Sequence, residues 1–256
     1  MFIPLHDANS LKRIKLQYVT FGLIAANALV FLFTGFATEE FVGGAVYGLG
    51  YIPSVVFDYV ELPPELIVVP EDLTYVTYAF LHGDIFHLGG NMLFLWVFGD
   101  NVEDALGHVR FLIFYLLCAA GGAFFHGVIA PDSEVPLIGA SGAIAGVVAA
   151  YLILHPKVKI WILAFGRIPL RIPAWIALAL WILLQFAMFA IAGEDQISWA
   201  CHVGGIISGA VLVFILRSRD APLFDREIVT PRAVVVERTS AVRPVEAQPA
   251  PRWGRQ

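Results

Sequence analysis

Long apolar runs dominate the chain, and polar residues interrupt them at only a few places. A helix needs about 20 mainly apolar residues to cross a membrane. The pattern predicts six spanning helices, at about residues 17–37, 86–105, 109–130, 140–155, 172–192 and 198–216. The first, third and fifth are uninterrupted, whereas the other three contain Gly, Ser, His or Asn. The pattern therefore predicts an all-α polytopic membrane protein built as a six-helix bundle.

The composition agrees with this prediction. Hydrophobic residues make up 59% of the 256 residues and charged residues only 14%, whereas a soluble domain carries about 25% charged residues. A net charge of −5 gives no reason to expect nucleic-acid binding. Both cysteines, Cys118 and Cys201, lie in apolar runs, so they predict buried thiols rather than a disulfide framework.

The lysines and arginines indicate which loops face the cytoplasm. They fall at the N-terminus, in the turn after the second predicted span, in the loop after the fourth, and in the C-terminal tail. The alternate loops, 38–85, 131–139 and 193–197, carry acidic residues and no basic ones. Basic loops stay on the cytoplasmic side. Six spans with both termini in the cytoplasm put every basic residue on one side, which five or seven spans do not.

The chain is expected to have three parts. Residues 1–16 form a cytoplasmic N-terminus, residues 17–217 form the membrane domain, and residues 218–256 form a mostly disordered cytoplasmic tail. The first outer loop, 38–85, is long and apolar, so we expect it to be functional and to lie in or on the outer leaflet.

Four polar side chains within the predicted spans are candidates for chemistry, because polar groups at membrane depth are costly. In the predicted orientation His87, Asn91, Ser141 and His202 all lie in the outer half of the membrane. His87 and Asn91 are four residues apart and share a helix face, where their N–H groups could stabilise an oxyanion. A serine hydroxyl becomes a useful nucleophile when a neighbouring imidazole accepts its proton.

Two glycine patterns suggest how the serine and the second histidine could meet. Gly142 and Gly146 follow Ser141, and Gly205 and Gly209 follow His202. Each pair forms G-x-x-x-G, a spacing that allows two helices to approach closely in lipid. If these two stripes pack on each other, Ser141 and His202 come within reach.

Each of these groups also has a simpler interpretation. Ser141 could be a small packing residue, His202 a satisfied interior histidine, and His87 and Asn91 interhelical hydrogen-bond partners. The segment G-A-S-G-A lacks the second glycine of a G-x-S-x-G elbow, and no H-E-x-x-H motif indicates zinc. A metal site at His82 and His87 lacks a carboxylate, so no metal or cofactor is expected. Four complementary groups at one depth nevertheless favour a serine nucleophile.

Four motifs, taken in their order, resemble the rhomboid family of intramembrane serine proteases over roughly residues 17–217. They are H-G-D-I-F-H-L-G-G-N (82–91), G-D-N-V-E-D-A-L-G (99–107), G-A-S-G (139–142) and A-C-H-V-G-G-I-I-S-G (200–209). The resemblance implies a six-helix bundle with its active site below the outer surface. It also implies cleavage of transmembrane helices near their outer end, without a cofactor.

The resemblance assigns roles to individual residues. Ser141 would be the nucleophile and His202 the general base of a dyad. His87, Asn91 and the backbone N–H of Ser141 would form the oxyanion site. Gly139 would belong to the motif that shapes the oxyanion site. His82 and Glu103 match positions that the family uses structurally.

Two positions depart from the family pattern. Many rhomboids carry a Trp-Arg pair in the first loop, where this chain has Leu73 and Thr74, so the loop must be anchored differently. Many also carry an aromatic residue four positions after the nucleophile, where this chain has Ala145. We therefore expect another residue, from a neighbouring span or Trp199, to orient His202.

We expect a substrate helix to enter past the fifth span, beneath a lid formed by residues 193–199. The expected partners are transmembrane-protein substrates and the lipid bilayer, and the expected location is a prokaryotic plasma membrane. Two other functions remain open. A chaperone of the same fold would bind helices without cutting them, and a small transporter would use the buried His and Asn residues along a solute path.

Overall fold

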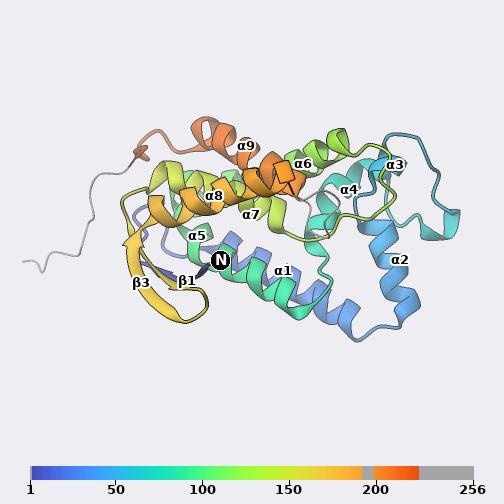
Figure 1. Cartoon of the computed structure of the whole chain (residues 1–256), viewed down its shortest axis with the longest axis horizontal. Helices are drawn as coiled ribbons and strands as arrows, with labels where there is room; N and C mark the ends of the chain where they lie inside the picture. The colour runs from blue at the N-terminus through green and yellow to red at the C-terminus, as the bar shows by residue number, and fades with distance from the viewer. Residues whose placement is uncertain (1, 192–198, 225–256) are drawn as a thin grey trace, which may run out of the picture.

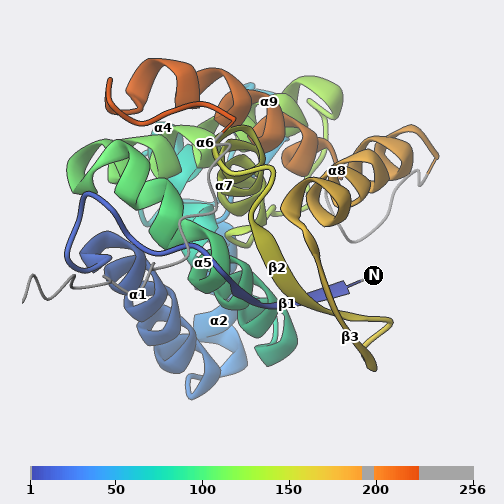
Figure 2. The ribbon, with the colours of Figure 1, turned by 90° about the vertical axis from the view of Figure 1, so that its left-hand side faces the viewer.

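Helices make up most of the computed structural model, which describes residues 2–191 and 199–224. Six helices coincide with the predicted apolar runs: α1 (Tyr18–Gly35), α5 (Ile85–Leu106), α6 (His108–Ile129), α7 (Ser141–Leu154), α8 (Ala174–Ile191) and α9 (Trp199–Leu216). Four of them, α1, α6, α8 and α9, are long and apolar enough to cross a membrane. In Figure 1 these helices run roughly along the long axis, and Figure 2 shows α1 and α9 on opposite sides of the bundle with α7 between them. The protein is therefore a mainly helical membrane protein.

The long first loop is itself folded. It contains α2 (Glu39–Leu49), α3 (Pro53–Val56), the 3-10 turn η1 (Pro64–Leu66), α4 (Glu71–Thr77) and the turn η2 (Tyr78–Phe80). These elements gather at one end of the molecule (Figure 1).

Two buried tyrosines anchor this loop in place of the Trp-Arg pair. Tyr51 and Leu137 exchange backbone hydrogen bonds of 3.1 and 2.8 Å. Tyr78 is fully buried and its hydroxyl donates to the carbonyl of Ala119 on α6 over 2.9 Å. Leu73, by contrast, is 53% exposed. The loop is thus tied to the chain that leads into α7.

The expectation of an all-α fold is wrong at the opposite end of the molecule. Three strands, β1 (Phe2–Asp7), β2 (Lys159–Ala164) and β3 (Ile168–Pro173), form an antiparallel sheet in that order. The charge pattern predicts a basic loop where the hairpin β2–β3 lies. The strand that completes the sheet comes from the far N-terminus, a pairing that local patterns do not reveal. Residues 2–7 are therefore part of the fold.

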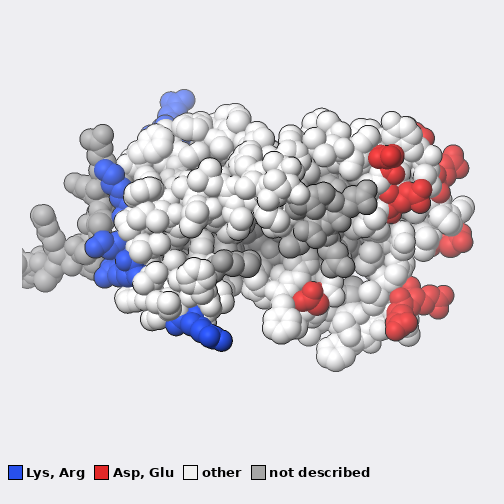
Figure 3. Space-filling model, viewed as in Figure 1, with Lys and Arg blue, Asp and Glu red and all other residues white. Residues whose placement is uncertain are grey.

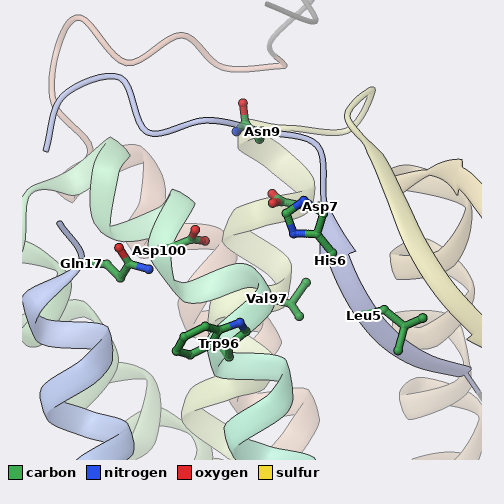
Figure 4. Close-up of a pocket in the computed structure, with 8 residues that line it drawn as sticks. All are labelled: Leu5, His6, Asp7, Asn9, Gln17, Trp96, Val97 and Asp100. Atoms are coloured by element: carbon green, nitrogen blue, oxygen red, sulfur yellow. The ribbon is translucent and has the colours of Figure 1, made fainter. Parts of the chain in front are cut away.

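The end of α5 holds the N-terminal segment against the helices. The Asn101 side-chain amide donates to Asp7 Oδ2 over 2.8 Å, and the Tyr151 hydroxyl donates to the same oxygen over 2.7 Å. Asp7 on β1 and Asp100 on α5 line one pocket (Figure 4). Burial is the main cause that raises the pKa of Asp7 to about 6.

Two further carboxylates on α5 bind the backbone that follows β1. Asp104 Oδ1 accepts hydrogen bonds from the N–H groups of Lys12, Arg13 and Ile14. Glu103, which is fully buried, accepts from the N–H of Val19 and from both the N–H and the hydroxyl of Thr20.

Glu103 thereby caps the first turn of α1, whose own N-cap, Gln17, makes no side-chain cap. The wider role that the resemblance implies for Glu103 in the family stays a prediction.

Charge divides the molecule along its long axis. On the face shown in Figure 3, the Lys and Arg side chains gather at the end that carries the sheet, and the Asp and Glu side chains gather at the end with α2 and α4. This is the separation that the loop charges predicted.

Candidate active site

Glycines bring α7 and α9 into backbone contact. A β-carbon on Gly205 would overlap the carbonyl of Gly142, and one on Gly209 would overlap the carbonyl of Gly146. No larger side chain fits at these positions without moving a helix backbone. The two predicted glycine stripes therefore do pack on each other.

The contacts also fix the register of the two helices. Gly142 lies against both Cys201 and Gly205, and Gly146 lies against both Gly205 and Gly209. Both helices rise equally per residue, so this register sets Ser141 level with His202. Ser141 is partly exposed and His202 is buried.

Ser141 begins α7, and no side chain caps this helix. The first backbone N–H groups of a helix lack an intrahelical acceptor. Together with the helix dipole they favour a negative charge at this end. The backbone N–H of Ser141 is therefore available as a donor beside its own hydroxyl.

Because Gly139 has no side chain, His87 and Asn91, the oxyanion candidates of α5, can approach the N-terminus of α7. The φ of +116° at Gly139 is a conformation that suits glycine. A β-carbon there would lie 2.6 Å from His87 Nε2 and 3.8 Å from Asn91 Nδ2. The N–H of Gly139 donates to the carbonyl of Tyr78 over 3.0 Å, so the first loop holds this backbone in position.

His82 orients Asn91. Asn91 Nδ2 lies 3.0 Å from His82 Nε2, and burial is the main cause that lowers the pKa of His82 to about 4. A neutral imidazole accepts a hydrogen bond through its unprotonated nitrogen, so the amide of Asn91 donates to it. Among the described residues, no acceptor is seen for the second hydrogen on Asn91 Nδ2. His82 therefore acts through Asn91.

A side chain absent from the sequence predictions orients His202. Gln185, on α8, is only 3% exposed, and its Oε1 lies 2.8 Å from His202 Nδ1. The ring of Trp181 stacks on that of His202 at 6.5 Å and 27°. Trp199 approaches the same ring edge-on at 5.7 Å and 86°. These three residues replace the aromatic support that Ala145 cannot give, and Trp199 was among those expected.

A signal for Gln185 was present in the sequence. It is the one amide in an otherwise apolar run of 18 residues, AWIALALWILLQFAMFAI, and an isolated polar group at membrane depth indicates a specific partner.

The prediction for the cysteines is confirmed, and most of the predicted lid and tail cannot be compared with the structure. Cys118 and Cys201 are buried as expected, and the Cys201 thiol lies 3.4 Å from the Tyr78 hydroxyl. Residues 193–198 of the predicted lid and residues 225–256 of the predicted tail lie outside the described residues.

Comparison with known proteins gives consistent matches. Residues 70–219 match a family model described as a rhomboid domain. The chain is 30% identical over 174 residues to "Rhomboid protein 1, mitochondrial" of Saccharomyces cerevisiae, covering 65% of this chain and 49% of that protein. It is 28% identical over 195 residues to "Presenilin-associated rhomboid-like protein, mitochondrial" of Homo sapiens, covering 75% and 47%. The chain thus spans about half the length of these relatives.

Proposed function

Because this chain belongs to the rhomboid family, we propose that it is an intramembrane serine endopeptidase that cleaves transmembrane helices near their outer end. The observation that carries this proposal is a convergence of side chains from three helices. His87 and Asn91 of α5 lie against Gly139, two residues before Ser141 of α7. The glycine contacts bring α9, and with it His202, to the level of Ser141.

The proposed topology has six spans with both termini in the cytoplasm. The basic end with the three-stranded sheet would face the cytoplasm, and the acidic end with α2 and α4 would face outward. The first loop, 38–85, would rest in or on the outer leaflet. In this orientation the N-terminus of α7 lies in the outer half of the membrane.

In the proposed reaction Ser141 Oγ attacks the carbonyl carbon of the scissile peptide bond. His202 Nε2 accepts the hydroxyl proton during the attack and returns it to the departing amine. The C–N bond breaks and an ester to Ser141 remains. Water then attacks this ester with His202 again as the base, which releases the new carboxyl end and restores the hydroxyl.

Negative charge develops on the carbonyl oxygen in both steps. The donors proposed for it are the free hydrogen of Asn91, the ring N–H of His87 and the backbone N–H of Ser141. Donors already fixed in place stabilise such a charge because they need not reorganise during the reaction. Gly139 allows these groups to come this close.

Substrate entry is proposed to occur past α8. Only 22% of the residues in α8 are buried, against 50% in α9, so α8 is the less firmly held of the two. An intact helix has its carbonyls hydrogen-bonded and shielded in lipid. Substrates with Gly or Pro near the outer end should therefore unwind and be cleaved more readily.

The relatives bear on the membrane in which the protein works. The two relatives named above are both described as mitochondrial, so they give no support to the expected prokaryotic plasma membrane. The proposal for location is an integral membrane protein whose active site opens on the side opposite its basic residues.

The proposal is tested by incubating purified protein with a single-span substrate that carries Gly and Pro near its outer end. The wild type and the control Ser133→Ala, a serine in the loop before α7, should cleave it, and Ser141→Ala should not. A serine-directed fluorophosphonate should label the wild type and not Ser141→Ala. Equal cleavage by wild type and Ser141→Ala, or none by the wild type across several lipids, contradicts the proposal. Helix binding without cleavage would favour a chaperone.

A further inference from the structure

We propose that Gln185 is a positioning residue that fixes the tautomer of His202, so that Nε2 of the imidazole is the proton acceptor. This inference rests on the proposed function, since it assigns a role within that site. It is carried by a chain of two hydrogen bonds that starts at a backbone carbonyl of α8.

The first hydrogen bond fixes the orientation of the Gln185 amide. Gln185 Nε2 lies 3.0 Å from the carbonyl oxygen of Trp181, one turn earlier in α8. A carbonyl oxygen can only accept, so the group that faces it must be the NH₂ end of the amide. The opposite assignment would place two oxygens against each other. The Oε1 end of Gln185 is therefore the end that faces His202.

The second hydrogen bond fixes the proton of the imidazole. Gln185 Oε1 can only accept, and it lies 2.8 Å from His202 Nδ1. Nδ1 must therefore carry the hydrogen. In a neutral imidazole the other nitrogen, Nε2, then has a free lone pair. A general base requires such a lone pair to take the hydroxyl proton from Ser141.

The surroundings of Gln185 hold it in this arrangement. Gln185 is only 3% exposed, although only 22% of the residues in α8 are buried. Trp181, whose carbonyl receives the amide, also stacks its ring on His202. A single turn of α8 thus supplies both the hydrogen bond and the stacking partner for the base.

This arrangement links the base to the helix past which substrates are proposed to enter. His202 lies on α9, but its orientation depends on α8. An outward displacement of α8 would withdraw Gln185 and Trp181 together. The base would then be correctly oriented only when α8 is packed against α9.

The kinetic test compares two substitutions of similar size. Gln185→Met removes the acceptor, and Gln185→Glu keeps an oxygen that accepts from Nδ1. Gln185→Met should lower kcat by about 10- to 100-fold, part of what a general base contributes, with KM changed by less than about twofold. Gln185→Glu should retain most of the kcat. Leu183→Met, a lipid-exposed position on the same helix, controls for the substitution itself.

The second test reads the tautomer directly. NMR of isotopically labelled histidine should show His202 protonated at Nδ1 in the wild type, with His202→Gln used to assign the signal. Gln185→Met should lose this single tautomer while keeping the thermal stability of the Leu183→Met control.

A wild-type His202 protonated at Nε2, or a Gln185→Met variant with unchanged kcat, overturns the inference. If the tautomer is as proposed and the wild type cleaves nothing, the proposed function fails while the role of Gln185 in orienting His202 stands.

Discussion

Helix α5 carries a polar cluster at each end, and the two clusters use their hydrogen bonds differently. At the sheet end, Asn101, Glu103 and Asp104 bind the N-terminal segment through side-chain and backbone donors. At the other end, His87 and Asn91 lie against a glycine with no side chain of its own. One cluster binds the N-terminal segment, whereas the other keeps donors that, among the described residues, are not all used by the chain.

The difference shows why a polar residue in a membrane helix is not by itself a sign of catalysis. Glu103 is fully buried and its oxygens accept from three donors of α1, so its hydrogen-bonding capacity is used within the fold. Asn91 uses one amide hydrogen on His82 and has a second to offer. The number of donors left over separates a structural cluster from a candidate site.

The largest effect on stability is expected at the sheet end of α5. Glu103→Ala would leave the donors of Val19 and Thr20 buried without their acceptor, which should lower the free energy of unfolding by about 3–5 kcal/mol. Thermal unfolding in detergent, followed by circular dichroism, measures this loss. Glu103→Gln, which keeps one acceptor oxygen, should lose less. If Glu103→Ala is as stable as the wild type but cleaves no substrate, Glu103 belongs to the active site instead.

The opposite pattern is expected at the other end. Asn91→Ala should reduce cleavage by about 100- to 1000-fold, the usual effect of removing one oxyanion donor, with little change in unfolding temperature. His82→Ala should show a smaller loss because it acts only through Asn91. If Asn91→Ala unfolds as readily as Glu103→Ala, and the protein that stays folded cleaves substrate at the wild-type rate, the two ends of α5 do not differ as described.

The smallest effect is expected from pH acting on Asp7. Its pKa is raised to about 6, so folding favours the protonated carboxyl. The stabilisation is fully present below the unfolded pKa of 3.8 and is lost as pH rises through about 6. It amounts to at most about 3 kcal/mol.

Strand β1 should therefore be bound more tightly at about pH 5 than at about pH 8. Hydrogen exchange of the β1 amides measures this difference. The groups that face Asp7 are His6, Asn101, Tyr151 and, across the pocket, Asp100. Asp7→Asn keeps an acceptor without a charge, so its exchange should vary less with pH. Equal variation in both proteins would assign the effect to another group.

The six helices could be predicted because their information is local. Span ends are marked by a change from apolar to charged residues, and the predicted range 198–216 differs by one residue from α9 (Trp199–Leu216). The candidate site could be assembled in outline for the same reason. The loop charges predicted the direction in which each helix crosses the membrane, and the glycine spacing predicted the contact between α7 and α9.

The sheet and the partner of Gln185 could not be predicted in this way because each depends on a distant segment of the chain. Phe2 pairs with Ala164, but no periodic pattern in the sequence distinguishes these strands from a basic loop. The role of Gln185 depends on the rotation of α8 about its axis, which decides whether its amide meets His202 or lipid. Hydropathy gives the existence of a helix but not this rotation.

The position of α9 between α6 and α7 has a consequence for biosynthesis. Its glycines pack against Gly121 and Gly122 of α6 on one side and against Gly142 and Gly146 of α7 on the other. It is also the last of the described helices to be made. A growing chain that has exposed Ser141 has not yet received His202, so the two proposed reactive groups meet only when the membrane domain is complete. A partly inserted chain would then be inert toward its neighbours in the membrane.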